Sequence, residues 1–265
     1  MKFPKPLAAI ALAVLMVPVA NAQTRSIKAD RADKTDSVAS KGFFTVGERL
    51  NYEVSWSSFI VAGELTIETK DRRSFDGVDG FHVSAQAKSV GLVSALVFKV
   101  NDVYDSFINA STLQPFRAEK RMRHGKKSSQ SSVVLDQKSG TAKLSDGSTI
   151  TIPADTYDLA GLLYAVRGMD LTVGKTRTFT LLEDNKLYTV RVEPEAREKI
   201  STRAGEYNVV RIATKTVRGG EAKDPYNLRF YVTNDSRRLP VLITAAPSWG
   251  DVRVELTSIT GVPGK

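Results

Sequence analysis

The chain contains two histidines and no cysteine, so few residues are available for metal binding or nucleophilic catalysis. His82 falls on the solvent-facing side of an expected strand, and His124 follows Arg123 in a basic turn. A zinc site would need both histidines together with carboxylates, and their spacing gives no support for one. The sequence also lacks a Gly-x-Ser-x-Gly elbow, a phosphate-cradling glycine loop and a dinucleotide fingerprint. We therefore expect no metal and no cofactor.

A carboxylate pair is the more serious enzymatic option, because glycoside hydrolysis needs only two carboxyl groups about 5 to 10 Å apart across a cleft. Acidic residues in or near expected strands are Glu48, Glu53, Glu64, Asp102 and Asp105. For any one of them, a solvated position on a strand face is the simpler interpretation. A Ser/His/Asp triad also stays open, since its members assemble in space and not in sequence.

Basic residues are densest between positions 117 and 127. Arg117, Arg121 and Arg123 share one face of an expected strand, and Lys126 follows in the turn. Because arginine offers paired donors to phosphate or uronate groups, these four residues form a candidate anion-binding ribbon. The alternative is a solvated hairpin whose charges discourage edge pairing.

Five aromatic residues are candidates for lining a ligand cavity, although each one alone is typical of a core. They are Trp56, Phe98, Tyr104, Tyr164 and Trp249. Residues 92–98 are apolar nearly all round, which indicates either burial on every side or a lip that closes such a cavity.

The first 22 residues resemble a secretory signal peptide. Two lysines precede an apolar run, and Ala20-Asn21-Ala22 is a small-x-small cleavage site. We expect cleavage after Ala22 and a periplasmic protein, with secretion as the alternative. Removing the two lysines lowers the net charge from +9 to +7, which suits anionic partners such as lipid headgroups or acidic glycans. Export and the absence of a basic face interleaved with aromatics argue against nucleic acid.

Polar residues 23–42 predict a disordered lead-in. From residue 43 to 260, apolar and polar residues alternate in short segments separated by turn residues, which is typical of antiparallel strands with one buried face. Asp146-Gly147, for example, predicts a hairpin that joins strands 141–144 and 149–152. No later segment approaches the length of a membrane-spanning helix.

Residues 155–168 carry the clearest helical signal. Apolar residues recur at i, i+3, i+4 and i+7, namely Leu159, Leu162, Leu163 and Val166. Asp155 is the expected N-cap and Gly168 the expected left-handed stop. We expect the leucine stripe to pack on the sheet, so that Leu162→Asp unfolds the protein. Tyr164 is expected on another side, where Tyr164→Ala leaves the protein folded.

Short matches recur at an offset of 125 to 127 residues. The first pairs Thr45-Val46-Gly47-Glu48 with Thr172-Val173-Gly174-Lys175, and the second pairs Asn109-x-Ser111 with Asn234-x-Ser236. They indicate two related β-rich halves, about 43–150 and 170–260, joined by the helix. The expected fold is mainly β, a curved antiparallel sheet or a barrel-like, lipocalin- or clam-like architecture.

Three blocks of the chain carry a family resemblance. They are Val46-Gly47-Glu48 with Tyr52, Trp56 and Gly63; Asp158-Leu159 with Leu162, Leu163, Tyr164 and Arg167; and Thr202 with Gly205-Glu206-Tyr207 and residues 234–241. Together they resemble the exported bacterial family catalogued as domain of unknown function 3108, over about 43–258. The resemblance implies an exported, β-rich envelope protein and supplies no reaction, so no catalytic residues carry over.

These patterns favour a non-enzymatic binding or scaffold protein for a lipid, another amphiphile or a glycan of the envelope. One alternative is a hydrolase or lyase that acts on cell-envelope polysaccharide. Another is a structural partner of an outer-membrane assembly, which would present a broad exposed apolar patch.

Overall fold

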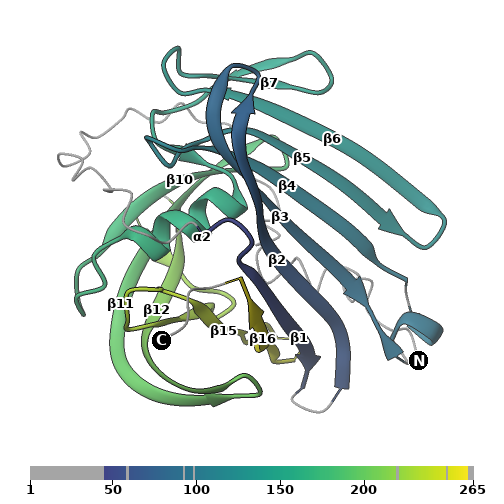
Figure 1. Ribbon diagram of the computed structural model, residues 1–265, viewed down its shortest axis with the longest axis vertical. Helices are drawn as coiled ribbons and strands as arrows, with labels where there is room; N and C mark the ends of the chain where they lie inside the picture. Colours follow the sequence, from purple (N-terminus) through teal and green to yellow (C-terminus); the bar gives the residue numbers. More distant parts are fainter. Residues whose placement is uncertain are drawn as a thin grey trace.

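The computed structural model describes residues 45–57, 60–91, 93–97, 99–218, 221–248 and 250–261. In these residues sixteen strands form one sheet (Figure 1). The strands before the helix are β1 (Arg49–Trp56), β2 (Ile60–Phe75), β3 (Val78–Ser89), β4 (Asn101–Asn109), β5 (Pro115–His124), β6 (Lys127–Asp136), β7 (Thr141–Leu144), β8 (Thr149–Thr151) and β9 (Thr156–Tyr157). The predicted leader 1–22 and lead-in 23–42 lie outside the described residues.

The remaining strands follow the helix α2 (Leu159–Gly168). They are β10 (Arg177–Glu183), β11 (Lys186–Thr202), β12 (Gly205–Arg218), β13 (Glu221–Lys223), β14 (Arg229–Thr233), β15 (Pro240–Ala245) and β16 (Val252–Thr260). A short π-helix, η2 (Val93–Val97), lies within the predicted apolar segment, and its Val93 is buried.

The sheet is antiparallel except where β9 pairs in parallel with β10. Its order is β8-β7-β6-β5-β4-β3-β2-β1-β16-β15-β14-β12-β11-β10-β9, with β13 paired to β12. The sheet is not closed, because β8 and β9 are its two ends. The last strand returns to the first, so the β1–β16 ladder joins the early and late strands directly. The prediction of a mainly β, barrel-like fold is confirmed, whereas the predicted role of the helix as the joint between two halves is not.

Helix α2 lies within the concave side of the curved sheet (Figure 1). It packs against β3, β4, β9 and β10. Leu159, Leu163 and Val166 are each 6 % exposed and belong to one continuous core with residues of the sheet. The predicted apolar stripe therefore packs on the sheet, except at Leu162, which is only half-buried.

The helix begins later than predicted, and Gly168 is its last helical residue instead of a left-handed stop. Asp155 adopts a left-handed conformation with φ of 62°, and the next two residues join β10 as β9. The N-cap is Asp158, whose carboxylate accepts a hydrogen bond of 2.6 Å from the Gly161 N–H. At the other end the chain continues with extended backbone at Met169, whose N–H reaches the Val166 carbonyl at 3.3 Å.

The C-terminal turn of α2 is fixed by a buried ion pair. Arg167 is 1 % exposed and donates two hydrogen bonds, of 2.6 and 2.9 Å, to the two carboxylate oxygens of Glu48, which precedes β1. The same guanidinium donates to the carbonyls of Arg237 and Arg238 in the turn between β14 and β15. Since a buried guanidinium must satisfy its five donors, this arrangement locks three distant segments together.

Tyr164 is also part of this buried network. Its ring lies under the Arg167 guanidinium, 4.8 Å from ring centroid to Cζ, and its hydroxyl lies 2.7 Å from the Thr69 hydroxyl. Tyr164 is 2 % exposed, whereas Leu162 is half-buried. The roles expected for these two residues are therefore reversed: Tyr164 is a core residue, and Leu162 lies at a surface opening.

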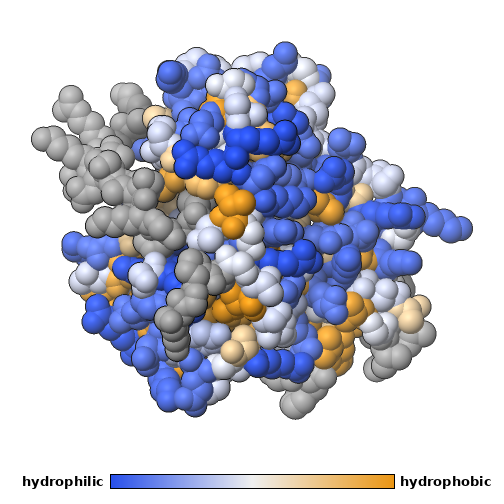
Figure 2. All heavy atoms as spheres, viewed as in Figure 1, coloured by the Kyte–Doolittle hydropathy of each residue, from blue (hydrophilic) through white to orange (hydrophobic). Residues whose placement is uncertain are grey.

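Charged and polar side chains cover most of the face seen in Figure 2, with apolar side chains in small groups. The exposed large apolar residues of the described chain lie at four places: Val46 and Val173 in two turns, Ile60 and Val61 at the start of β2, and Val134 in β6. This part of the chain therefore shows no broad apolar patch of the kind expected for an assembly partner. None of its helices combines the length and apolar character needed to cross a membrane.

The neighbouring residues Leu162 and Leu163 give a matched test of the position of the helix. Leu163→Ala should lower the free energy of unfolding by about 2 to 5 kcal/mol, because it leaves a cavity in the core. Leu162→Ala should cost about 1 kcal/mol. Urea unfolding monitored by circular dichroism measures both values, and equal losses would contradict the position assigned to Leu162.

The Glu48–Arg167 pair predicts a second pattern of stability. Glu48→Met leaves a buried guanidinium without its carboxylate, which should cost about 3 to 5 kcal/mol. The double variant Glu48→Met/Arg167→Met removes both charges and should recover part of that loss. Thermal and urea unfolding of the three proteins check this order. A single variant as stable as the parent protein would show that the pair does not hold the helix.

Candidate functional site

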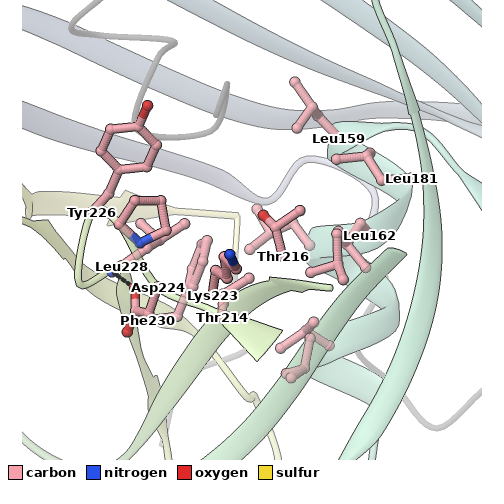
Figure 3. Close-up of a pocket in the computed structure, with 15 residues that line it drawn as sticks. Leu159, Leu162, Leu181, Thr214, Thr216, Lys223, Asp224, Tyr226, Leu228 and Phe230 are labelled. Atoms are coloured by element: carbon pink, nitrogen blue, oxygen red, sulfur yellow. Dashed lines mark hydrogen bonds between the residues drawn. The ribbon is translucent and has the colours of Figure 1, made fainter. Parts of the chain in front are cut away.

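An apolar groove runs along the face of α2 that carries Leu162 (Figure 3). Leu159, Leu162 and Leu181 lie on one side of the groove, and Tyr226 and Leu228 lie across it. The floor and remaining walls are contributed by Leu163 and Val166 of α2, Val190 and Val192 of β11, Thr214 and Thr216 of β12, Pro225, and Phe230 of β14. The groove has a volume of about 50 Å³ and is open to the surface.

Local sequence patterns explain why this groove is apolar. The helical period directs Leu159, Leu162 and Val166 to one side, and the alternation of β11 directs Val190 and Val192 to the same face. The segment from 224 to 228 is held over β12, because the Thr214 N–H donates to the Leu228 carbonyl at 3.1 Å. The wall that faces the helix is therefore anchored by a backbone hydrogen bond.

Two charged residues, Lys223 and Asp224, stand at the rim of the groove. Asp224 is occupied, since it accepts from Arg229 at 2.6 Å and from the Leu228 N–H at 3.1 Å. The side chain of Lys223 is 59 % exposed, and its ion pair with Glu221 is long, at 3.8 Å. Lys223 is thus a cation available at the mouth of an apolar groove.

A second, polar pocket of about 220 Å³ lies where β4, β5 and β6 approach the turn between β10 and β11. Tyr104, Lys120 and Ser131 are register partners across three adjacent strands, so they share one face of the sheet. Opposite them, Asp184 and Asn185 form a tight turn with φ of 45° and 60°. This turn places Glu183, at the end of β10, beside Lys120.

The polar pocket contains an ion cluster that bridges the two parts of the sheet. Lys120 contacts the Glu183 carboxylate and also lies 2.9 Å from Asp184. Burial raises the pKa of Glu183 to about 7 even though the Lys120 ammonium lowers it. Behind it, burial raises the pKa of the helix cap Asp158 to about 6, against the hydrogen bonds that favour its ionised form. Two carboxyl groups in this region therefore hold protons more tightly than ordinary side chains.

Of the five predicted cavity aromatics, Tyr104 alone lines a described pocket. Its hydroxyl is buried, and burial raises its pKa well above the ordinary value. Trp56 is half-buried at the end of β1 and packs against the core, where its indole nitrogen has no hydrogen-bond partner in the described chain. Tyr164 lies in the core network. Phe98 and Trp249 lie outside the described residues.

The predicted basic ribbon is partly neutralised by its neighbours. Arg117 pairs with Glu119 and, at 2.9 Å, with Asp76, while Arg121 contacts Asp105 at 2.5 Å. The side chains of Arg123 and Lys126 are exposed and make no ion pair within the described ranges. The charges of Arg117 and Arg121 are thus neutralised by nearby carboxylates. Within the predicted ribbon, the uncompensated charges are those of Arg123 and Lys126 at the tip of the hairpin.

Both histidines bind carboxylates instead of forming a joint site. His82 lies 2.9 Å from Asp105, and His124 lies 2.9 Å from Asp102. The described residues contain no group of three or more His, Asp or Glu side chains arranged to hold a metal ion. The carboxylate of Glu48 forms an ion pair with Arg167, and that of Glu53 forms an ion pair with Arg203 at 2.7 Å.

Apart from Tyr104, the residues that form the two pockets were not predicted as site residues from the sequence. Leu162 was expected to pack in the core, and Glu183 did not stand out, because each looks ordinary within its own segment. Lys120 lay within the basic run, but its partners are 63 and 64 residues away. A signal existed in the Glu183-Asp184-Asn185 turn, whose first residue is acidic and directly follows Leu181 and Leu182, two buried residues of β10.

The fold and pockets define an open, mainly antiparallel β-sheet protein that encloses the helix α2 and has an apolar groove beside it. The chain belongs to the family described as protein of unknown function DUF3108, whose model matches residues 51–257. Comparison with curated proteins finds no match.

Comparison with solved structures finds one protein that shares the fold and another with a weaker likeness. A β-barrel-like protein of the DUF1849 family from Brucella abortus is 13 % identical, with a TM-score of 0.59 over 82 % of this chain and 98 % of that one. A DUF1089 family protein from Pseudomonas aeruginosa is 8 % identical, with a TM-score of 0.42 over 77 % and 92 %. At such low identity the first likeness describes the fold alone.

The raised pKa of Glu183 predicts a pH-dependent stability. Between its ordinary value of 4.5 and about 7, the folded protein holds the proton and the unfolded chain does not. The contribution of this group to the free energy of unfolding therefore falls as pH rises through that window and is constant above it. Glu183→Gln should abolish this part of the pH dependence of the unfolding free energy, measured by urea unfolding across the pH range. Glu221→Gln, at an exposed position, should keep it. The same slope in parent and Glu183→Gln proteins would contradict the assignment.

Proposed function

We propose that the protein is a non-enzymatic binding protein for an envelope amphiphile, whose apolar chain lies in the groove beside α2. The observation that carries this proposal is the half-buried Leu162, which opens a leucine- and valine-lined groove to the surface. Apolar side chains at such an opening remain in contact with water unless a ligand covers them. Burial of each methylene group contributes about 0.8 kcal/mol, so a chain of about six gives roughly 5 kcal/mol before the costs of binding.

The rim of the groove favours an anionic headgroup. Lys223 is exposed and weakly paired there, whereas Asp224 is already bound by Arg229 and by backbone. A carboxylate or phosphate at the end of an apolar chain would reach an ammonium group without displacing a short ion pair. The ligand class proposed is therefore a single-chain amphiphile with a negatively charged head.

An exported location agrees with this ligand class. The leader pattern at 1–22, with its basic start and Ala20-Asn21-Ala22 site, supports export to the periplasm. In that compartment a lipid chain needs protection from water when it leaves a membrane.

We also infer that the two β-rich halves are related copies. Gly47 and Gly174 have φ of 87° and 86°, and each donates a hydrogen bond to the next long strand, at Thr69 and Pro194. Leu113 and Arg238, 125 residues apart, are both left-handed residues shortly before a strand that begins with proline. Such matches at turns support duplication, because backbone geometry restricts the residue types there.

The second candidate function is hydrolysis of envelope polysaccharide. It is favoured by Glu183, whose pKa of about 7 suits a general acid and whose carboxyl lines the polar pocket. The other raised carboxyl, Asp158, is committed to capping α2, which ranks this function below binding. Release of reducing ends from purified peptidoglycan, abolished in Glu183→Gln, would place hydrolysis first.

Calorimetric titration with dodecanoate tests the proposed function. The parent protein should bind it, and Leu162→Arg should weaken binding by at least about tenfold, because a charge then lies in the path of the chain. Lys223→Glu should weaken binding of dodecanoate but leave binding of neutral dodecyl maltoside unchanged.

Lys126→Glu is the matched control, since it makes the same charge change at the tip of the basic hairpin. Loss of dodecanoate binding in Lys126→Glu with no loss in Lys223→Glu would move the anion site to that hairpin. Native mass spectrometry of protein purified from the periplasm should show a co-purified amphiphile. No binding by the parent protein in either experiment would remove the proposal.

A further inference from the structure

We propose that the polar pocket formed by β4, β5, β6 and the β10–β11 turn is a binding site for one neutral, hydroxyl-rich group, a sugar ring. This pocket is separate from the apolar groove, and the inference does not rest on the proposed function.

Glu183 has an unused acceptor at the wall of the pocket. The residue is 6 % exposed and lines the cavity, and Lys120 contacts one of its two carboxylate oxygens. The other oxygen, Oε2, is buried and has no hydrogen-bond partner in the described chain. An unpaired buried carboxylate oxygen is costly. Above a pH of about 7, where Glu183 is ionised, a small rotation of its side chain toward a ligand O–H or N–H group would therefore gain a strong hydrogen bond.

The charges around this acceptor select a neutral donor. Lys120 lies between Glu183 and Asp184, so an ammonium ligand would meet a resident cation at the same place. An anionic ligand would meet two carboxylates. A hydroxyl group avoids both repulsions, since it can donate to the carboxylate and accept from the ammonium or an amide.

The remaining walls fit a ring with polar edges. Ser131, Ser132 and Asn185 line the opening with hydroxyl and amide groups, and Tyr104, Ala118 and Val133 supply a less polar side. A volume of about 220 Å³ is ample for one small ring. Hydroxyl donors and acceptors arranged around an apolar wall are the complement of a pyranose, which has polar edges and a less polar face.

The test is a nitrogen-15 NMR titration of the full-length exported protein with methyl β-glucoside, ethanolamine and inorganic phosphate. Methyl glucoside should shift the amide signals of Ser131, Ser132 and Asn185 to saturation. Ethanolamine and phosphate should not. Shifts of these signals by either charged probe, or no saturable shift by the sugar, would overturn the inference.

Variants then assign the site. Glu183→Met should weaken binding of the sugar by about tenfold, the change expected for loss of one charged hydrogen bond. Ser131→Trp should abolish it by filling the cavity, while Ser128→Trp, three positions earlier on the same exposed strand edge and on its other face, should not. Both serines are exposed, so these two variants are expected to fold even where Glu183→Met does not. Unchanged sugar binding in Ser131→Trp would refute the location.

A final pair of titrations distinguishes a sugar ring of a glycan from a sugar ring of a glycolipid. If the ring belongs to a glycan, dodecyl β-glucoside and methyl β-glucoside should bind the polar pocket equally. If it belongs to a glycolipid, the dodecyl compound should bind more tightly and should also shift signals of the apolar groove. Leu162→Arg should remove only that additional affinity, so failure of the groove and failure of the sugar pocket give different results.

Discussion

The buried pair of Glu48 and Arg167 is the interaction on which the arrangement of the molecule depends. It joins the entrance of β1, the last turn of α2 and the turn before β15, which are separated by 119 and about 70 residues of sequence. A buried ion pair contributes little net stability compared with apolar residues of the same volume, but it is strongly specific, since either charge alone is costly. Its consequence here is geometric: with its C-terminal end fixed there and its N-terminal end capped by Asp158, the helix can present only one face to β11 and β12.

The open sheet determines where the two pockets lie. Because β1 pairs with β16, the early and late strands form one continuous surface, and α2 fills its concave side without reaching the segment 224–228. The uncovered strip becomes the apolar groove. At the opposite margin, residues 127–132 of β6 pair with β5 on one side and continue beyond the end of β7 on the other. This part of β6 approaches the β10–β11 turn, where Lys120 connects the two parts of the sheet. The groove and the polar pocket thus follow from incomplete closure of one sheet.

Local patterns in the sequence were enough to predict the local structure. Asp146-Gly147 predicted the β7–β8 hairpin correctly, because that turn needs residues that accept positive φ, and the leucine period predicted α2. The same local patterns placed the helix cap at Asp155, because they contain no sign that Thr156 and Tyr157 pair with the distant strand β10. The polar composition of segment 194–202 likewise does not indicate a strand, yet this segment continues β11 through pairing with β12. The pocket residues could not be predicted for the same reason. Glu48 contacts Arg167, and Lys120 contacts Glu183, only after the sheet has formed.

The central claim, that the groove beside α2 holds an apolar chain, is tested most directly by NMR of protein labelled at the leucine and valine methyl groups, titrated with dodecanoate below its micelle concentration. Saturable shifts are expected at the groove residues Leu162, Leu163, Leu181 and Val192. The signals of Val46 and Val134, which are exposed elsewhere, should not change. Shifts spread over the exposed valines, or no saturation at the groove residues, would contradict it.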